Sequence, residues 1–182
     1  MAIGIEREPR RFREAIELTD CVRLARSVSF VHGDAEAMEP PKGFDVLWGQ
    51  SAWIHFADPG AFLRRWCAAL PRGGRIAVED MALARDVSRG DRAALDQLAH
   101  LWGARFAPLD EWIRHISTAR CRIIVAADET QACDVYFARM LQVSLRWPGC
   151  DETDDERTAW MLARTLLQAG VTTFFRIIGK KE

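Results

Sequence analysis

Polar residues follow three short apolar runs in the first third of the chain. Glu6 follows the first run, Asp34 the second, and Gln50 with Ser51 the third. If the runs are parallel strands, these side chains lie at the edge of the sheet where open α/β sheets bind ligands. Carboxylate and amide oxygens there accept hydrogen bonds from ligand hydroxyl and amino groups. Simpler interpretations stay open, with Glu6 as a surface acid, Asp34 as an Asx-turn and Gln50–Ser51 as a polar loop.

β-type runs alternate with helical patterns along most of the sequence. This alternation predicts an α/β fold with a mostly parallel sheet covered by helices on both faces. Neither a repeat nor a linker interrupts the pattern, so we expect one domain over residues 1–182. The predicted strands cover about residues 2–5, 28–32, 44–48, 75–79, 121–127 and 172–178. The predicted helices cover 9–25, 58–70, segments from 88 and from 109, 133–144 and 153–170.

Charge and cysteine content exclude several classes of protein. A net charge of −1 gives no electrostatic case for a nucleic acid or membrane-surface partner. The five cysteines form no close-spaced pair and the four histidines lack metal-ligand spacing, so we expect neither a zinc site nor a disulfide framework. Neither a membrane-spanning run nor a signal-peptide core occurs, and we expect the chain to lie in the cytoplasm.

Four motifs resemble those of class I S-adenosylmethionine (SAM)-dependent methyltransferases. Ile3–Glu6 resembles the second strand with its terminal acid, and Ser27–Met38 the third strand with its acidic turn. Gly43–Asp58 resembles the fourth strand with the loop after it, and Leu70–Asp80 the Gly-Gly turn and fifth strand. The nearest resemblance is to small-molecule enzymes of the sarcosine/dimethylglycine type. It implies a Rossmann-like, mostly parallel sheet with an antiparallel last strand.

The resemblance also assigns a role to each polar residue, with SAM as the cofactor. It implies that Glu6 accepts hydrogen bonds from the ribose hydroxyls, and that Asp34 accepts one from the adenine amino group. The Ala35 amide would face a ring nitrogen, and Gln50 and Ser51 would line the methionine end. Trp48, Trp53 and His55 are candidates for the pocket wall, and His55 is also a candidate base; no catalytic residue is assigned.

The family's first strand and glycine-rich turn have no counterpart in the sequence. That strand would lie between the second and the fourth, so its absence leaves two apolar strands with unpaired edges. A misassigned start, a true fragment or pseudoenzyme, or a strand supplied by another chain would each explain this. We expect the chain alone to bind SAM weakly and to associate through its exposed edges.

The two halves of the chain have different expected tasks. Residues 1–82 form a partial cofactor-binding half, while 83–182 hold a helical substrate or cap region and the last two strands. Apolar residues of that region suit a small organic acceptor or a plain core, namely Trp102, Trp112, Phe137, Met140, Trp147 and Trp160. A non-catalytic partner protein and a nucleoside-binding module of another chemistry stay open as alternatives.

Overall fold

The computed structural model describes residues 1–146 and 154–182. The chain divides into two compact units, Met1–Pro41 and Lys42–Glu182, which we call the N-terminal unit and the C-terminal unit. Trp147, named above as an acceptor candidate, and Thr153, the first residue of the predicted last helix, lie outside the described residues.

The N-terminal unit is a single β-α-β element. Its strands are parallel, and Glu6 pairs with His32 at the carboxyl ends of both. The helix begins with Pro9 in its first turn, where a missing N–H costs nothing, and the Glu8 side chain accepts a hydrogen bond from the Arg11 amide at 2.7 Å. The elements are β1 (Ala2–Glu6), α1 (Pro9–Cys21) and β2 (Val28–His32).

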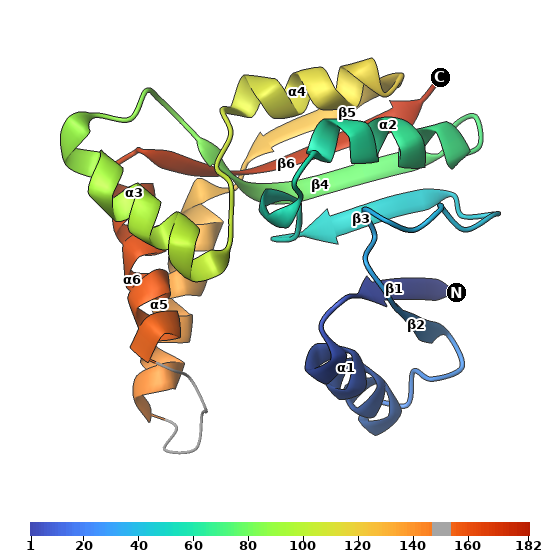
Figure 1. The fold of residues 1–182 in the computed structure, drawn as a ribbon, viewed down its shortest axis with the longest axis horizontal. Helices are drawn as coiled ribbons and strands as arrows, with labels where there is room; N and C mark the ends of the chain where they lie inside the picture. The colour runs from blue at the N-terminus through green and yellow to red at the C-terminus, as the bar shows by residue number, and fades with distance from the viewer. Residues whose placement is uncertain (147–153) are drawn as a thin grey trace. The chain divides into compact units, whose positions relative to one another are not determined.

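The C-terminal unit contains a mixed four-stranded sheet, shown in Figure 1. Its strands are β3 (Val46–Gln50), β4 (Arg75–Leu83), β5 (Cys121–Asp128) and β6 (Thr172–Lys181). Their order is β3-β4-β6-β5, with β3 parallel to β4 and with β6 antiparallel to both of its neighbours. The expected adjacency of 44–48 with 75–79 is therefore confirmed, and so is the antiparallel last strand.

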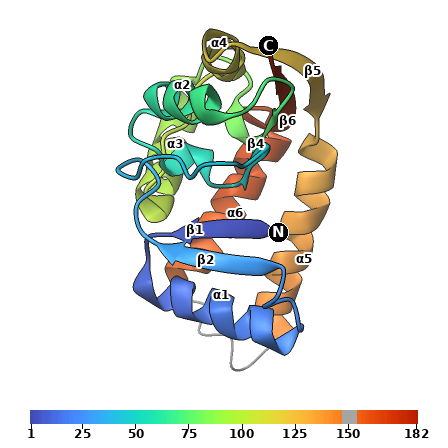
Figure 2. The ribbon, with the colours of Figure 1, turned by 90° about the vertical axis from the view of Figure 1, so that its right-hand side faces the viewer.

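Helices of the C-terminal unit form two groups around this sheet. The helix α2 packs beside α4, while α6 contacts both α3 and α5; the two groups are visible in Figures 1 and 2. The helical elements are η1 (Trp53–His55), α2 (Pro59–Ala69), α3 (Arg89–Trp102), α4 (Leu109–Thr118), α5 (Thr130–Arg146) and α6 (Asp154–Gln168).

Two helices begin at the caps that the sequence predicts. The Asp58 carboxylate accepts a hydrogen bond from the Ala61 amide at 2.8 Å, directly before α2. The Ser88 hydroxyl accepts one from the Asp91 amide at 3.3 Å, directly before α3. Each cap satisfies an N–H group that has no partner inside the helix, which fixes the first turn.

The buried core lies in the C-terminal unit. Leu63 of α2, Ile76 of β4 and Ile116 of α4 are fully buried. A second cluster lies between α3, α5, α6 and the sheet, and it is formed by Met81, Leu95, Leu98, Cys133, Phe137, Ala159, Ala163, Leu166, Leu167, Val171 and Phe174. Both groups bury the apolar stripe of a helix against the sheet or a neighbouring helix, as an α/β fold requires.

Two features of the sheet differ from the sequence prediction. The third strand covers Val46–Gln50 instead of 44–48, and Phe44, which precedes it, packs its ring against Trp66 with centroids 6.0 Å apart. The six strands form two sheets instead of one. Within residues 1–146 and 154–182, β1 pairs only with β2 and β3 only with β4, so each keeps an unpaired edge.

Candidate functional site

Glu6 lies at the carboxyl end of β1, where the sequence places it. The Gly33 amide donates a hydrogen bond to the Glu6 carbonyl at 3.0 Å, which holds the end of β2 against that of β1. The Glu6 Oε1 atom accepts a hydrogen bond from the Glu8 amide at 2.8 Å. The Oε2 atom has no hydrogen-bond partner in the part of the chain that the structure describes. Glu6 therefore keeps one oxygen for a ligand while the other orders the start of α1.

Asp34 follows β2 and is exposed. Its Oδ1 atom accepts a hydrogen bond from the Glu36 amide at 2.8 Å, which is the Asx-turn that the sequence left open. This turn leaves Oδ2 without a partner among the described residues, so the turn and a ligand contact are compatible. The parallel pairing of β1 and β2 brings Glu6, Asp34 and Ala35 to the same end of the N-terminal unit.

Gln50 and Ser51 lie at the corresponding end of the C-terminal sheet. Gln50 pairs with Glu79 of β4, and the Ser51 amide donates to the Glu79 carbonyl at 2.9 Å. Ser51 has a backbone φ of 50°, in the left-handed region that residues other than glycine rarely adopt. Such a conformation costs energy and concentrates at functional sites, where it bends the chain sharply after a strand.

Asp80 holds the loop after β3 and was not among the predicted site residues. Its carboxylate is fully buried, and Oδ2 accepts hydrogen bonds from the amides of Trp53 at 2.8 Å and Ile54 at 3.1 Å. Burial raises the pKa of Asp80 from 3.8 to about 6, while hydrogen bonds from backbone amides, first that of Met81, oppose the increase. A buried carboxylate with several N–H donors is a rigid anchor for the loop that carries Ser51.

A polar residue in an apolar strand was the available signal for Asp80. The β4 sequence runs through Ile76 and Val78 to Asp80, and these three side chains all point to the buried face. The period-two pattern therefore places a carboxylate in the core. The strand predicted from the sequence ends at residue 79, one residue before Asp80, so the prediction does not include this pattern.

The aromatic residues proposed for the pocket wall separate into core and surface. Trp53 is 2% exposed and donates from Nε1 to the Gly49 carbonyl at 2.8 Å, which places it in the core. Trp48 is 64% exposed on β3. The His55 ring nitrogen Nδ1 lies 3.4 Å from the Gly103 carbonyl oxygen. This contact connects the loop after β3 to the end of α3.

Three of the acceptor candidates on the later helices, Trp102, Phe137 and Trp160, pack against one another, while Trp112 packs against Phe175. Trp112 and Phe137 are buried. Trp102 and Trp160 contact each other edge to face, with ring centroids 5.6 Å apart, and both contact Phe137. For these residues the contacts correspond to the plain-core interpretation.

In the described ranges no group of three or more His, Cys, Asp or Glu side chains is arranged to hold a metal ion. None of the described helices combines the length and apolarity needed to cross a bilayer.

No family model and no curated protein matches the sequence. Solved structures match nearly all of it, beginning with a candidate sarcosine dimethylglycine methyltransferase from Galdieria sulphuraria, at 12% identity and a TM-score of 0.82. A phosphoethanolamine N-methyltransferase 2 from Haemonchus contortus, in complex with phosphomonomethylethanolamine and S-adenosylhomocysteine, matches at 14% identity and a TM-score of 0.80. Geranyl diphosphate C-methyltransferase from Streptomyces coelicolor, in complex with Mg²⁺, geranyl diphosphate and S-adenosyl-L-homocysteine, matches at 13% identity and a TM-score of 0.76.

These matches cover 98–99% of this chain. In return, the chain spans 69% of the Galdieria protein, 63% of the Streptomyces enzyme and 43% of the Haemonchus enzyme. The chain thus has the fold of the class I SAM-dependent methyltransferases, over a part of their length. The expected fold class is confirmed.

Proposed function

We propose that this chain is part of a SAM-dependent methyltransferase that acts on a small organic acceptor. The observation that carries the proposal is the position of Glu6, Asp34, Gln50 and Ser51. All four lie at or directly after the carboxyl ends of parallel strands, the edge at which open α/β sheets bind ligands. The neighbours of the same fold that hold S-adenosylhomocysteine support SAM as the cofactor.

The hydrogen-bonding residues present fit the nucleoside part of SAM. Glu6 would accept from the ribose hydroxyls through the oxygen that the Glu8 amide leaves open. Asp34 would accept from the adenine amino group, with the Ala35 amide toward a ring nitrogen. Gln50 and Ser51 would line the methionine end, on a loop that Asp80 fixes. A glycine-rich turn is absent from the described residues, so the fit is to one part of the cofactor.

Placement is the main task of the protein in this chemistry. The cofactor supplies an electrophilic methyl group when bound, and the enzyme aligns the acceptor with it and excludes water. His55 is the one imidazole on the loop after β3, and it is the candidate to take a proton from an acceptor that must lose one. The acceptor region would be the helices of residues 83–182, in a reducing cytoplasm where the cysteines stay free.

A non-catalytic binding partner is the second candidate function. The observation that favours it is the pair of unpaired edges on β1 and β3. Without a central strand, no strand pairing joins the two sheets that carry the proposed cofactor residues. The cofactor site is then less preorganised, which lowers its affinity for SAM. We therefore propose that methyl transfer by this chain alone is impaired, and that the edges are its means of self-association.

Calorimetric titration with SAM tests the proposal. We expect the 182-residue chain to bind SAM more weakly than about 10 µM. A form extended upstream by a strand and a glycine-rich turn should bind tightly. In that form, Asp34→Ala should weaken binding at least about tenfold, because a hydrogen bond to a charged group is lost. Glu17→Ala is the matched control, since it removes another exposed acid of the N-terminal unit.

The outcomes separate the candidates. Equal losses in the Asp34 and Glu17 variants would contradict the adenine assignment. Absence of SAM binding in the extended form would favour the non-catalytic partner, and a preference for NAD over SAM would favour a nucleoside-binding module of another chemistry. Tight binding of SAM by the monomeric 182-residue chain would contradict the proposed impairment.

A further inference from the structure

Three basic residues stand in one row across the C-terminal sheet. Lys180 of β6 is the register partner of Arg75 on β4 and of Arg122 on β5. Residues in register project from the same face of a sheet, so the three side chains form a continuous cationic row. All three are exposed. The row joins positions far apart in the sequence, so the fold alone creates it.

Like charges directly opposite one another destabilise a sheet, and little compensates for them here. The Nε atom of Arg122 lies 3.9 Å from a Glu182 carboxylate oxygen, which is a long ion pair. In the part of the chain that the structure describes, Arg75 and Lys180 form no ion pair. The chain as a whole carries a net charge of −1, so the row is a local concentration of positive charge and not the result of a basic protein.

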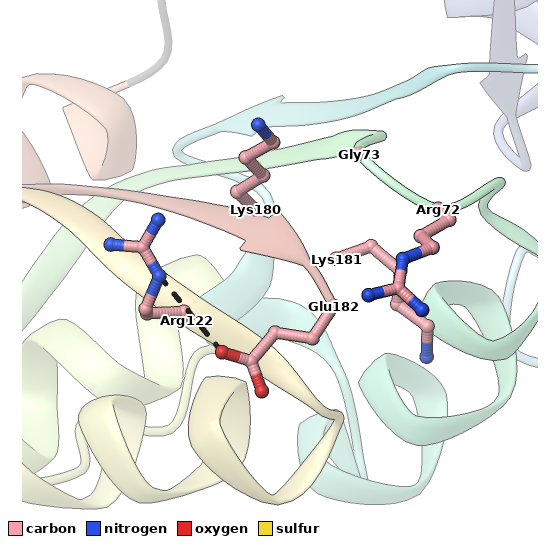
Figure 3. A pocket seen from close by; sticks show the side chains of 6 residues that line it. All are labelled: Arg72, Gly73, Arg122, Lys180, Lys181 and Glu182. Atoms are coloured by element: carbon pink, nitrogen blue, oxygen red, sulfur yellow. Dashed lines mark ion pairs between the residues drawn. The ribbon is translucent and has the colours of Figure 1, made fainter.

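Two members of the row, Lys180 and Arg122, line an open hollow of about 600 Å³ at this end of the sheet (Figure 3). Besides Lys180, Arg122 and Glu182, it is lined by Arg72, Gly73 and Lys181. Lys180 and Arg122 project from one face of the sheet, whereas Lys181, the next residue of β6, projects from the other, as Figure 3 shows. The cations that share one face are therefore Lys180, Arg122 and their row partner Arg75. An anion on this face would be attracted to the row, and it would relieve the repulsion within it.

Backbone hydrogen bonds fix the wall of this hollow. The Gly73 amide donates to the Lys181 carbonyl at 3.0 Å, and the Lys181 amide donates to the Gly74 carbonyl at 2.8 Å. Gly73 has a φ of 86°, which disfavours any residue with a side chain, and a Cβ atom there would lie 3.7 Å from the Lys180 Cε. The turn is thus held to the end of β6, beside the cationic row.

We propose that the row of Arg75, Lys180 and Arg122, at the rim of the hollow, binds a small anion that carries two or more phosphate groups. Guanidinium and ammonium groups are the common protein ligands of phosphate oxygens. The row spans two interstrand steps, or roughly 10 Å, so several phosphate groups match it better than one. The row lies at the other end of β4 from Asp80, which anchors the loop of Gln50 and Ser51, since Arg75 and Asp80 are five residues apart on this strand, or roughly 17 Å.

Titration of the 182-residue chain with inorganic tripolyphosphate, at low salt and without SAM, tests this proposal. We expect binding that weakens as salt is added and that is stronger than binding of orthophosphate. Lys180→Glu should lower the affinity for tripolyphosphate at least about tenfold. Arg139→Glu is the matched control, because it makes the same charge change at an exposed position of α5. The affinity of this variant for tripolyphosphate should stay within about twofold of that of the unaltered chain.

The folded state is checked in the same samples by circular dichroism. Lys180→Glu should not lower the melting temperature, because it relieves a like-charge contact. Lys180→Gln removes the charge without adding a carboxylate and should lower the affinity less than Lys180→Glu does. Equal losses in the Lys180→Glu and Arg139→Glu variants, or no binding by the unaltered chain, would overturn the site. Equal affinity for orthophosphate would overturn the assignment to a polyphosphate.

Discussion

The two units of the chain place polar ligands at strand ends in the same way but differ in what supports them. Every residue from Met1 to Pro41 is described, and none of them is buried. Ile3 of β1 is 47% exposed and Val31 of β2 is 38% exposed. In the C-terminal unit, by contrast, Leu63 and Ile76 are fully buried. One unit has a core, and the other has secondary structure without one.

The two parts of the proposed cofactor site therefore differ in how firmly their residues are held. Asp80 ties the loop after β3 to a buried strand through two amides. Glu6 and Asp34 are held only by exposed local hydrogen bonds, to the amides of Glu8 and Glu36. Elements of about 40 residues rarely bury enough apolar surface to be stable alone. Ordering the adenosine end should therefore cost more than ordering the methionine end.

Hydrogen exchange should show the largest contrast between the units. Amides of β1 and β2 should exchange faster than those of β4 and β6 by a factor on the order of 10³ or more, because local opening without a core costs almost no free energy. Mass spectrometry of deuterated peptides measures this difference directly. Similar protection in both units would mean that the N-terminal unit is stabilised by interactions outside its own core.

Core truncation should affect the two units unequally. Leu63→Ala should lower the free energy of unfolding by about 2–5 kcal/mol, since it removes a fully buried side chain and leaves a cavity. Ile3→Ala should cost less than about 1 kcal/mol, because Ile3 is already 47% exposed. Urea denaturation of both variants gives the comparison. A cost for Ile3→Ala equal to that for Leu63→Ala would contradict the difference between the units.

A smaller effect should appear in the pH dependence of stability. Because the pKa of Asp80 is raised from 3.8 to about 6, its protonated form favours the folded state, and stability should fall as pH rises through this window. The contribution is about 1–3 kcal/mol. Asp80→Asn removes the titration and should flatten the profile between pH 4 and 6. Urea denaturation across this window is the measurement.

Asp86→Asn is the control for this profile, because Asp86 is an exposed acid of the same unit. The decrease in the free energy of unfolding between pH 4 and 6 should persist in this variant and be smaller in Asp80→Asn. A profile that is unchanged in Asp80→Asn would mean that other groups set the pH dependence.

Local features of the fold could be predicted because they depend on neighbouring residues. Asp58 and Ser88 begin helices through side chains that reach amides three positions away. Glu6 and Asp34 end strands through turns of similar range. Each of these interactions is encoded within a few consecutive residues, so a pattern search finds it.

Features that depend on strand register are visible in the sequence only in part: the period-two pattern of β4 places Asp80 in the core, but it does not name the groups that Asp80 meets there. Asp80 becomes an anchor only because β4 buries it beside the amides of Trp53 and Ile54. The row formed by Arg75 and Lys180 with Arg122 requires the pairing of three distant segments. The left-handed φ of Ser51 could not be predicted either, because a serine carries no sequence signal for it.

The position of β6 has a consequence for the order in which the sheet is made during translation. The strand from Thr172 to Lys181 lies between β4 and β5, yet it is the last described strand that a ribosome would synthesise. Until it emerges, β4 and β5 have no partner between them, and both present open backbone groups. At that stage the helices that precede β6 in the chain have already been synthesised, but the facing edges of β4 and β5 are still unpaired. The C-terminal sheet therefore forms late, through long-range pairing, and until then the nascent chain exposes strand edges to which chaperones can bind.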